Sequence, residues 1–217
     1  MTKLRLVVGD KNLSSWSMRP YLALRLAGVP FDEEVVILDR PDTAQRIAAW
    51  SPSGRVPVLV DGDVRIWDSL AIVEYLAEKL PDARLWPADR AARAMARSAC
   101  AEMHSGFAAL RATMSMNVRA RRPLATLAPA VRREVDRMEE LWRTCRGAQG
   151  GPFLFGAFGG ADCWFAPVVT RFVTYAPPVA ADTRSYMDAV LAHPVVAAWI
   201  REAEAEAELT GSHLREH

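Results

Sequence analysis

The sequence has few cysteines, little net charge and no long apolar run. Its three cysteines, Cys100, Cys145 and Cys163, are widely spaced and include no C-x-x-C pair, which argues against a disulfide framework and against a zinc site. We therefore expect buried free thiols in a reducing cytoplasm. The 27 Lys and Arg residues nearly balance the 26 Asp and Glu residues, which leaves a net charge of +1. That balance does not predict binding to nucleic acid or to an anionic membrane.

Segments for targeting or membrane insertion are also lacking. No stretch approaches the roughly 20 apolar residues of a membrane span, and Met1 to Gly9 lacks the apolar core of a signal peptide. We expect a cytoplasmic protein that holds no metal and acts on a small molecule. With 217 residues, 51% of them hydrophobic, the chain can bury the core of one large domain or of two small ones.

The pattern of the chain changes near residue 80. Before it, short β-branched runs alternate with helical patterns, and Asp61 to Asp63 forms a tight turn between the last two runs. The predicted order is βαβαββα. The strands are expected at Leu4–Val8, Glu33–Leu38, Val56–Val60 and Val64–Trp67, and the helices at Ser17–Gly28, Thr43–Ala49 and Asp68–Leu80.

The second part of the chain reads as helical throughout. Residues 81–90 contain two prolines and no periodicity, which is typical of a linker. The helices are expected at Arg90–Met116, Pro129–Arg146, Ala161–Tyr175, Asp182–Leu191 and Pro194–Glu208. The third of these is mostly apolar and should lie at the centre of a bundle, whereas the alternating EAEAEAE run of the last one indicates a solvated helix end. We thus expect an α/β domain at 1–80, a linker at 81–90 and an all-α domain at 91–217.

Three serines in four residues precede the first predicted helix, in the stretch NLSSWSMRPYLAL. Pro20 has no N–H and fits best in a first helical turn, so Ser17 is the predicted N-cap. Ser14 and Ser15 then remain in the loop before the helix. They are either turn formers or hydroxyls that face the partly positive helix end, where an anion is favoured.

Val56 and Pro57 come directly before the third predicted strand, in the run GRVPVL. A proline there indicates a terminal strand position, and about one X–Pro bond in twenty is cis. With a cis bond, the backbone N–H and C=O of Val56 would be free to pair with an extended, peptide-like ligand.

Asp68 and Ser69 stand where a strand gives way to a helix, in the run WDSLAI. The commonest role for these residue types at that point is an N-cap. Alternatively, Ser69 and the first helical N–H groups hold a ligand carboxylate, while Asp68 accepts a hydrogen bond from a ligand ammonium.

In this order and spacing, the three motifs resemble those of the cytosolic glutathione S-transferases. The matching patterns are S-S-W-S-x-R, V-P-V-L and D-S-x-A-I-x-x-Y-L, followed by a proline-containing linker, a helical half and the run FLFGAFGGAD. The resemblance covers essentially the whole chain and is greatest to the serine-type classes, especially zeta, and more loosely to delta, theta and bacterial relatives. It implies a thioredoxin-like α/β domain, an all-α domain, a homodimer, and glutathione as co-substrate with no other cofactor.

The resemblance also implies roles for individual residues. Aligned on the zeta pattern, Ser14 donates to the glutathione sulfur, whereas counting back from Arg19 as in delta gives that role to Ser15. Val56, before Pro57, would pair with the cysteinyl part, and Asp68 with Ser69 would hold the γ-glutamyl end. The glycine carboxylate would be reached by Arg40 and Arg55, although both also read as ordinary surface arginines.

The second substrate would be a hydrophobic, electrophilic small molecule held against the helical half. Apolar lining and polar groups for such a pocket occur in the loop and in the first long helix, and many of the apolar ones also fit a bundle core. The candidates are Trp16, Met103, Phe107, Arg111 and Met114, with Met116, His104 and Asn117 nearby.

The implied chemistry is activation of a thiol as thiolate. A thiol of pKa about 8.5 is about 3% ionised at pH 7, and one of pKa about 6.5 is about 75% ionised. That shift needs about 2.7 kcal/mol, which one hydroxyl and one helix N-terminus can supply. The serine would donate a hydrogen bond and stay protonated.

Two departures from the family pattern limit what it implies. Trp16 stands where zeta enzymes carry a cysteine, which argues against an isomerisation that depends on that thiol, and Gly159 replaces the usual Ser or Thr N-cap before Asp162. We therefore predict a glutathione transferase. The alternatives are a glutathione-binding carrier without turnover and a glutathione-dependent isomerase or dehalogenase.

Overall fold

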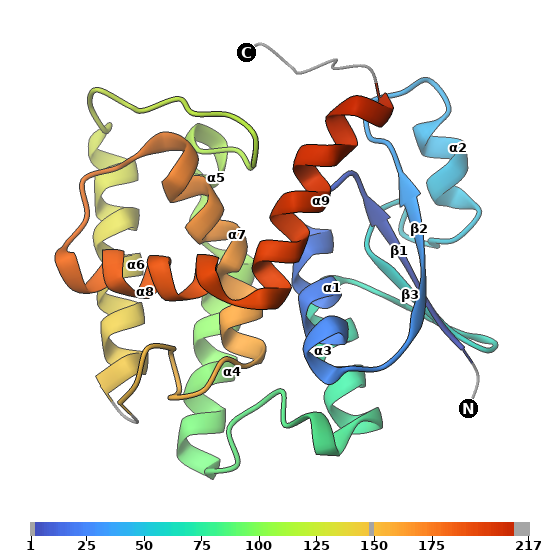
Figure 1. Cartoon of the computed structure of the whole chain (residues 1–217), viewed down its shortest axis with the longest axis horizontal. Coiled ribbons are helices and arrows are strands. Elements are labelled where there is room, and N and C mark those ends of the chain that lie inside the picture. Colours follow the sequence, from blue (N-terminus) through green and yellow to red (C-terminus); the bar gives the residue numbers. More distant parts are fainter. Residues whose placement is uncertain (1–2, 148–149, 211–217) are drawn as a thin grey trace.

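A four-stranded sheet and three helices form the first part of the chain. The computed structural model describes residues 3–147 and 150–210 (Figure 1). The elements are β1 (Leu4–Gly9), α1 (Ser15–Ala27), β2 (Phe31–Val36), α2 (Thr43–Ala48), β3 (Val58–Asp61), β4 (Val64–Trp67) and α3 (Ser69–Lys79). The order βαβαββα is confirmed. The third strand begins two residues later than predicted, because Pro57 has no N–H to donate to the sheet.

The register of the sheet brings the three sequence motifs to one edge. The strand order is β2-β1-β3-β4, with β1 parallel to β2 and antiparallel to β3. Val7 pairs with Val58, and Val58 pairs with Trp67. The end of β1, the start of β3 and the end of β4 therefore lie side by side. Residues 10–15, called the serine loop, lie next to that edge, and so do Val56, Pro57 and the start of α3.

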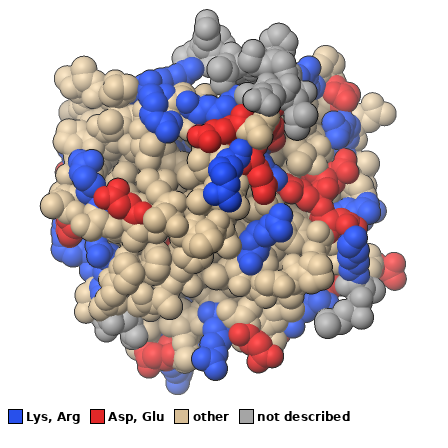
Figure 2. Space-filling view, in the orientation of Figure 1, with Lys and Arg blue, Asp and Glu red and all other residues tan. Residues whose placement is uncertain are grey.

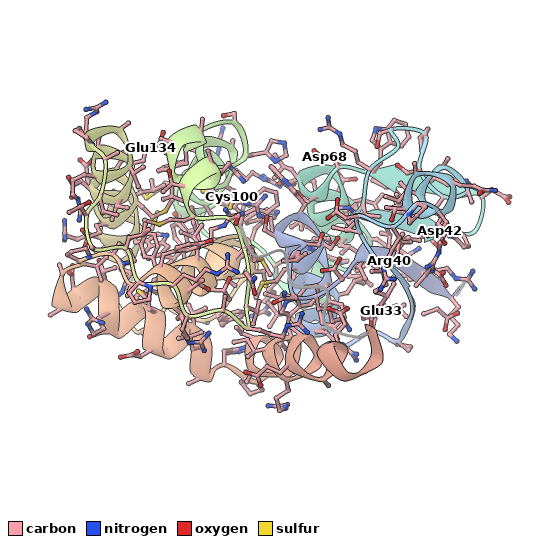
Figure 3. The ribbon with its side chains drawn as sticks, turned by 90° about the horizontal axis from the view of Figure 1, so that it is seen from above. Glu33, Arg40, Asp42, Asp68, Cys100 and Glu134 are labelled. Carbon is pink, nitrogen blue, oxygen red and sulfur yellow. The ribbon has the colours of Figure 1, made fainter. Side chains whose placement is uncertain are left out.

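The helical part follows a short 3-10 turn, η1 (Pro81–Ala83). Its helices are α4 (Arg90–Ser105), α5 (Ala108–Thr113), α6 (Pro129–Gly147), α7 (Gly160–Tyr175), α8 (Ala181–Ala192) and α9 (Pro194–Thr210). Every residue of α7 except Val173 is buried, which confirms the predicted central helix. The three cysteines are buried free thiols, as expected; Cys100 lies inside this half (Figure 3).

The N-terminus of α7 is capped as its sequence predicts. Gly159 is the N-cap. The Asp162 carboxylate accepts hydrogen bonds from the Gly159 N–H at 2.9 Å and from the Leu154 N–H at 3.1 Å. The Tyr186 hydroxyl donates to the same carboxylate at 3.1 Å. The carboxylate thus ties α7 to the segment before it and to α8.

The prediction of one helix from Arg90 to Met116 is wrong. α4 ends at Ser105 with Gly106 as its C-cap, and Phe107 has a φ of 60°, which a continuous helix does not allow. The Glu134 carboxylate of α6 accepts hydrogen bonds from the Ala109 and Leu110 N–H groups and thereby caps α5 (Figure 3). The chain after the break turns toward the serine loop, which brings Arg111 and residues 115–117 to the edge of the sheet.

α9 crosses the junction of the two halves and packs on α1 (Figure 1). Figure 2 shows acidic and basic side chains interleaved on the face that α9 shares with the sheet, with no broad field of one sign. Over the described ranges, no helix has the length and apolar character needed to cross a bilayer.

Candidate functional site

Two adjoining clefts lie at the edge of the sheet where the motifs meet. The first, of about 640 Å³, is called the serine cleft and is bordered by residues 13–16, 54–56, 111, 115–117, 122 and 171 among others. The second, of about 500 Å³, is called the α3 cleft and is lined by Ser53, Pro57, Trp67, Asp68, Ser69 and His104. Trp16, Arg55 and Val56 line both clefts. The two spaces are therefore neighbours, large enough together for an extended peptide-like molecule.

The serine loop lies closer to α1 than the sequence suggested. Ser14 is the N-cap of α1 and Ser15 is its first residue, so the prediction of Ser17 as cap is wrong. Ser17 instead accepts hydrogen bonds from the Gly9 N–H at 3.0 Å and from the Ser14 hydroxyl at 2.7 Å. Pro20 lies in the second turn, where it costs one backbone hydrogen bond. None of the described side chains caps α1, so the positive end of the helix opens on the serine cleft.

Gly9 allows this close packing of the loop against β1. A Cβ at residue 9 would lie 2.9 Å from the Ser14 Cβ and 3.0 Å from its Oγ. Any other side chain at this position would push Ser14 away. The absence of a side chain at Gly9 therefore helps to fix the position of the loop.

Ser15 is held by a buried arginine, Arg171, that none of the sequence motifs includes. Arg171 of α7 donates to the Ser15 Oγ at 2.9 Å and to the Met114 carbonyl at 2.7 Å. Burial, with a smaller effect of the nearby Arg111, lowers the pKa of Arg171 to about 10. The guanidinium remains charged at neutral pH, and among the described residues it forms no ion pair. An arginine in an otherwise apolar helix was the only signal in the sequence.

The bond between Val56 and Pro57 is cis, and Val56 lines both clefts. Val56 precedes β3, and its backbone makes no hydrogen bond to any other described residue. A backbone donor and acceptor are thus left for a ligand at the boundary of the two clefts.

The start of α3 offers an unpaired buried hydroxyl. Ser69 is only 1% exposed and lines the α3 cleft, and its hydroxyl has no hydrogen-bond partner within residues 3–147 and 150–210. Asp68 caps α3 by accepting from the Leu70 N–H at 2.8 Å, and it does so with a φ of 73°, a strained value for aspartate. A buried polar atom without a partner beside a helix N-terminus is well suited to an anionic ligand group.

Asp68 also links the two halves of the chain. Its second carboxylate oxygen lies 3.3 Å from the Nε2 atom of His104 on α4, and Figure 3 places Asp68 at the junction of the halves. His104 lines the α3 cleft, and its ring meets the edge of Trp16 at 5.1 Å between centroids. The α3 cleft is thus bordered by both halves of the protein.

Trp16 forms the partition between the clefts. Its ring is flanked by the guanidinium of Arg19 at 4.4 Å and by that of Arg111 at 4.7 Å from the centroid. Arg19 is fully buried between Trp16 and Trp164, which lowers its pKa well below the ordinary value. These contacts fix the indole in place.

The remaining predicted residues are spread more widely. Arg55 is exposed and borders both clefts, whereas Arg40 is exposed on the sheet side and is not a lining residue of either one (Figure 3). Met103, Phe107 and Met114 are buried in the core, with exposed fractions of 0, 6 and 0%. Arg111, Met116 and Asn117 line the serine cleft.

Two family models match most of the chain. The model described as "Glutathione S-transferase, N-terminal domain" matches residues 13–79, and the one described as "Glutathione S-transferase, C-terminal domain" matches residues 96–202. The first match includes all three motifs at the edge of the sheet, and the second includes α7 with Arg171.

The chain is also similar to individual proteins of known name. It is 33% identical over 140 residues to Glutathione S-transferase Z2 of Arabidopsis thaliana, covering 62% of this chain and 63% of that protein. It is 39% identical over 95 residues to a "Probable maleylacetoacetate isomerase" of Caenorhabditis elegans, covering 43% and 44%. With Glutathione S-transferase 1 of Dianthus caryophyllus the match covers 38% of that protein, so the chain spans less than two thirds of these relatives.

A solved structure extends the similarity over the full fold. A glutathione transferase homolog from Burkholderia, crystallised with bound glutathione, is 25% identical, has a TM-score of 0.71, and matches 94% of this chain and 98% of its own. A Tau class enzyme from mango, 22% identical with a TM-score of 0.69, shares the fold. The predicted fold, a thioredoxin-like domain with an all-α domain, is therefore confirmed.

Proposed function

This chain belongs to the glutathione S-transferase family, and we propose that it binds glutathione across the two clefts and conjugates it to electrophilic small molecules. Residues 1–80 hold the glutathione, residues 91–217 hold most of the electrophile site, and residues 81–90 connect them. We further propose that the protein works as a cytoplasmic homodimer.

The glutathione lies with its γ-glutamyl end in the α3 cleft and its thiol in the serine cleft. The γ-glutamyl carboxylate accepts from the unpaired Ser69 hydroxyl and from the N-terminus of α3, and Asp68 attracts the ammonium group. The backbone of Val56 pairs with the cysteinyl part. Arg55 is better placed than Arg40 to reach the glycine carboxylate, because it borders both clefts.

Ser15 donates the hydrogen bond that stabilises the thiolate. Its oxygen accepts from Arg171, so its own proton is left for the sulfur, whereas the Ser14 proton is donated to Ser17. A hydroxyl that donates to an ionised partner contributes about 1.5–3 kcal/mol, and the uncapped end of α1 adds about 0.3–1 kcal/mol. Together they reach the roughly 2.7 kcal/mol that two pKa units require. The thiolate then attacks the electrophilic carbon and forms a thioether.

The observation that carries the proposal is the continuity of the clefts. One path runs from the buried, unpaired hydroxyl of Ser69, past the free backbone of Val56, to the hydroxyl of Ser15. These three features match an anionic end group, a peptide backbone and a thiol in the order in which glutathione carries them.

The test uses the purified chain, immobilised glutathione and an activated aryl halide. The proposal predicts retention on the resin, elution by free glutathione, and thioether formation that saturates with both substrates. Retention without turnover would support the carrier alternative instead, and no retention together with no turnover would refute both.

A second candidate, glutathione-dependent isomerisation, is favoured by the arginines of the serine cleft. Arg111 and Arg171 line it, and both donate to neutral oxygens without forming an ion pair among the described residues. Two guanidinium groups at one cleft suit a substrate with carboxylates, and one relative is named a probable maleylacetoacetate isomerase. In that reaction the thiolate adds to a cis double bond, the bond rotates, and the thiolate leaves again.

The two functions are separated by the fate of glutathione. Incubation with maleylacetoacetate and catalytic amounts of glutathione should give the trans product without loss of glutathione if the chain is an isomerase. Consumption of one glutathione per product, with aryl halides as the better substrates, would favour the transferase. Trp16 at the position of the zeta-class cysteine favours this second outcome.

A further inference from the structure

The last helix carries two glutamates that face the serine loop. The EAEAEAE run was predicted to be a solvated helix end, and that prediction is wrong for Glu202 and Glu206. These residues are one helical turn apart and lie on the same side of α9, where both are partly buried. Glu204 lies between them in the sequence and is exposed. Glu204 therefore fits the solvated interpretation, and the side chain of Glu208 lies outside the described part of the chain.

Glu206 accepts hydrogen bonds from two consecutive amides of the serine loop. Its Oε1 atom lies 3.0 Å from the Lys11 N, and its Oε2 atom lies 3.2 Å from the Asn12 N. The partners are almost 200 residues apart in the sequence. Each carboxylate oxygen has one N–H donor, which is the bidentate arrangement that a single carboxylate can offer to adjacent amides.

Other groups of α9 hold the same loop residue. The Trp199 Nε1 donates to the Lys11 carbonyl at 3.1 Å. The Lys11 ammonium pairs with Glu202 and, at 2.7 Å, with Glu33 of β2, which Figure 3 labels on the sheet side. The Lys11 side chain is only 9% exposed. Lys11 is therefore fixed through its amide, its carbonyl and its ammonium group.

The loop is held from the opposite side as well. The Val118 N–H donates to the Asn12 carbonyl at 3.2 Å, and the Arg119 N–H donates to the Asn12 side chain at 3.1 Å. The segment between Gly9 and Ser15 is short, so a shift of Lys11 or Asn12 is passed on to Ser14 and Ser15. The Ser15 oxygen must stay within hydrogen-bond distance of Arg171 and of a bound sulfur at the same time.

We propose that Glu206 is a positioning residue for the thiol-activating serine loop, and that α9 sets the geometry in which Ser15 meets the sulfur of glutathione. The inference rests on the proposed function. Glu206 does not line either cleft, and it contacts the serine loop through the Lys11 and Asn12 amides. Without its carboxylate, two adjacent amides would lose their partner and the loop would lose its anchor on α9.

The test compares Glu206→Gln with the matched control Glu204→Gln. The glutamine has the same shape but offers one acceptor oxygen in place of two, so we expect a fall in kcat of about tenfold and a rise of about one unit in the pKa of the bound glutathione thiol. The KM for glutathione should stay within about twofold, because the α3 cleft is untouched. The control, which removes the same charge from the exposed side of α9, should match the wild type in all three values.

Several results would overturn the inference. One is a folded Glu206→Gln protein with wild-type kcat and thiol pKa, because a residue that only stabilises the fold would leave both unchanged per folded molecule. A second variant, Trp199→Phe, removes one neutral hydrogen bond to the loop. It should lower kcat about threefold, and an unchanged kcat would also count against the inference. If Glu206→Gln does not fold, Trp199→Phe and the exchange measurement below decide the matter.

Amide hydrogen exchange in the wild type tests the anchor independently of activity. The Lys11 and Asn12 amides should be protected, and rapid exchange at both would refute the anchor even if the enzyme is active. Conversely, protected amides in a protein that neither binds nor activates glutathione would refute the proposed function and leave the anchor as a structural contact only.

Discussion

The change Ser15→Ala tests the thiol-activating hydroxyl most specifically. The Ser15 side chain is 5% exposed and lines the serine cleft, and its Oγ accepts from Arg171 at 2.9 Å. Alanine removes the hydroxyl and adds no bulk. The lost hydrogen bond to the thiolate amounts to about 1.5–3 kcal/mol, which corresponds to a rise of about one to two units in the pKa of the bound thiol. At neutral pH, kcat/KM for an aryl halide should fall by about 10- to 100-fold.

The assay is a pH profile of kcat/KM with an aryl halide, for the wild type, Ser15→Ala and the control Ser14→Ala. Ser15→Ala should move the rise of the profile to higher pH, and the rates should approach those of the wild type once the thiol is fully ionised. Ser14→Ala removes a hydroxyl that donates to Ser17 and should have the smaller effect. The reasoning is refuted if Ser15→Ala keeps the wild-type profile, or if Ser14→Ala alone shifts it.

Three further changes probe other parts of the site. Ser69→Ala should raise the KM for glutathione by about tenfold or more and leave kcat at saturation unchanged, since it removes a contact that is made equally before and during reaction. Arg111→Met should weaken binding of a carboxylate-bearing electrophile by about tenfold and leave a neutral aryl halide unaffected, as measured by the two KM values. Burial raises the pKa of Asp162 to about 6, despite the hydrogen bonds that it accepts. Since the folded carboxyl binds its proton more tightly than the unfolded one, the free energy of unfolding should fall as the pH rises from about 3 to 7, by about 3 kcal/mol, and urea titrations should find this slope absent in Asp162→Asn.

Local sequence signals were sufficient for the architecture. Alternating apolar runs, the turn at Asp61 to Asp63 and the prolines of the linker predicted every strand and most helices, because each signal acts over a few neighbouring residues. The same holds for the cleft residues Val56, Asp68 and Ser69, which stand at the ends of elements. The register of the sheet, Val7 with Val58 and Val58 with Trp67, then brought them together.

The errors concern the ends of helices, which local sequence patterns do not determine. Pro20 was predicted in the first turn of α1, but the structure has it in the second turn, which makes Ser14 the cap. The apolar pattern of Arg90–Met116 continued across Gly106, but the left-handed backbone at Phe107 ends the helix there. At the start of α1, Ser17 accepts from the Gly9 N–H and the Ser14 hydroxyl and so is not free to cap the helix. At the break before α5, the decisive contact is with Glu134 of α6, which caps α5.

The sequence did not predict the long-range partners of the serine loop. Arg171 and Glu206 contact the loop from helices more than 150 residues away, and nothing in their own neighbourhoods indicates that contact. An arginine within an apolar helix and a glutamate in an alternating acidic run were the only signs. Their contacts with the loop become recognisable only when the helical half is packed against the sheet.

Titration of the glutathione thiol on the wild-type protein tests the central claim most directly. The thiolate is followed by its ultraviolet absorbance while the complex is taken through the neutral pH range, with free glutathione as reference. Stabilisation by Ser15 and the N-terminus of α1 predicts an apparent thiol pKa of about 6.5, two units below the value of about 8.5 for a free thiol. A bound thiol that titrates like free glutathione would contradict the claim.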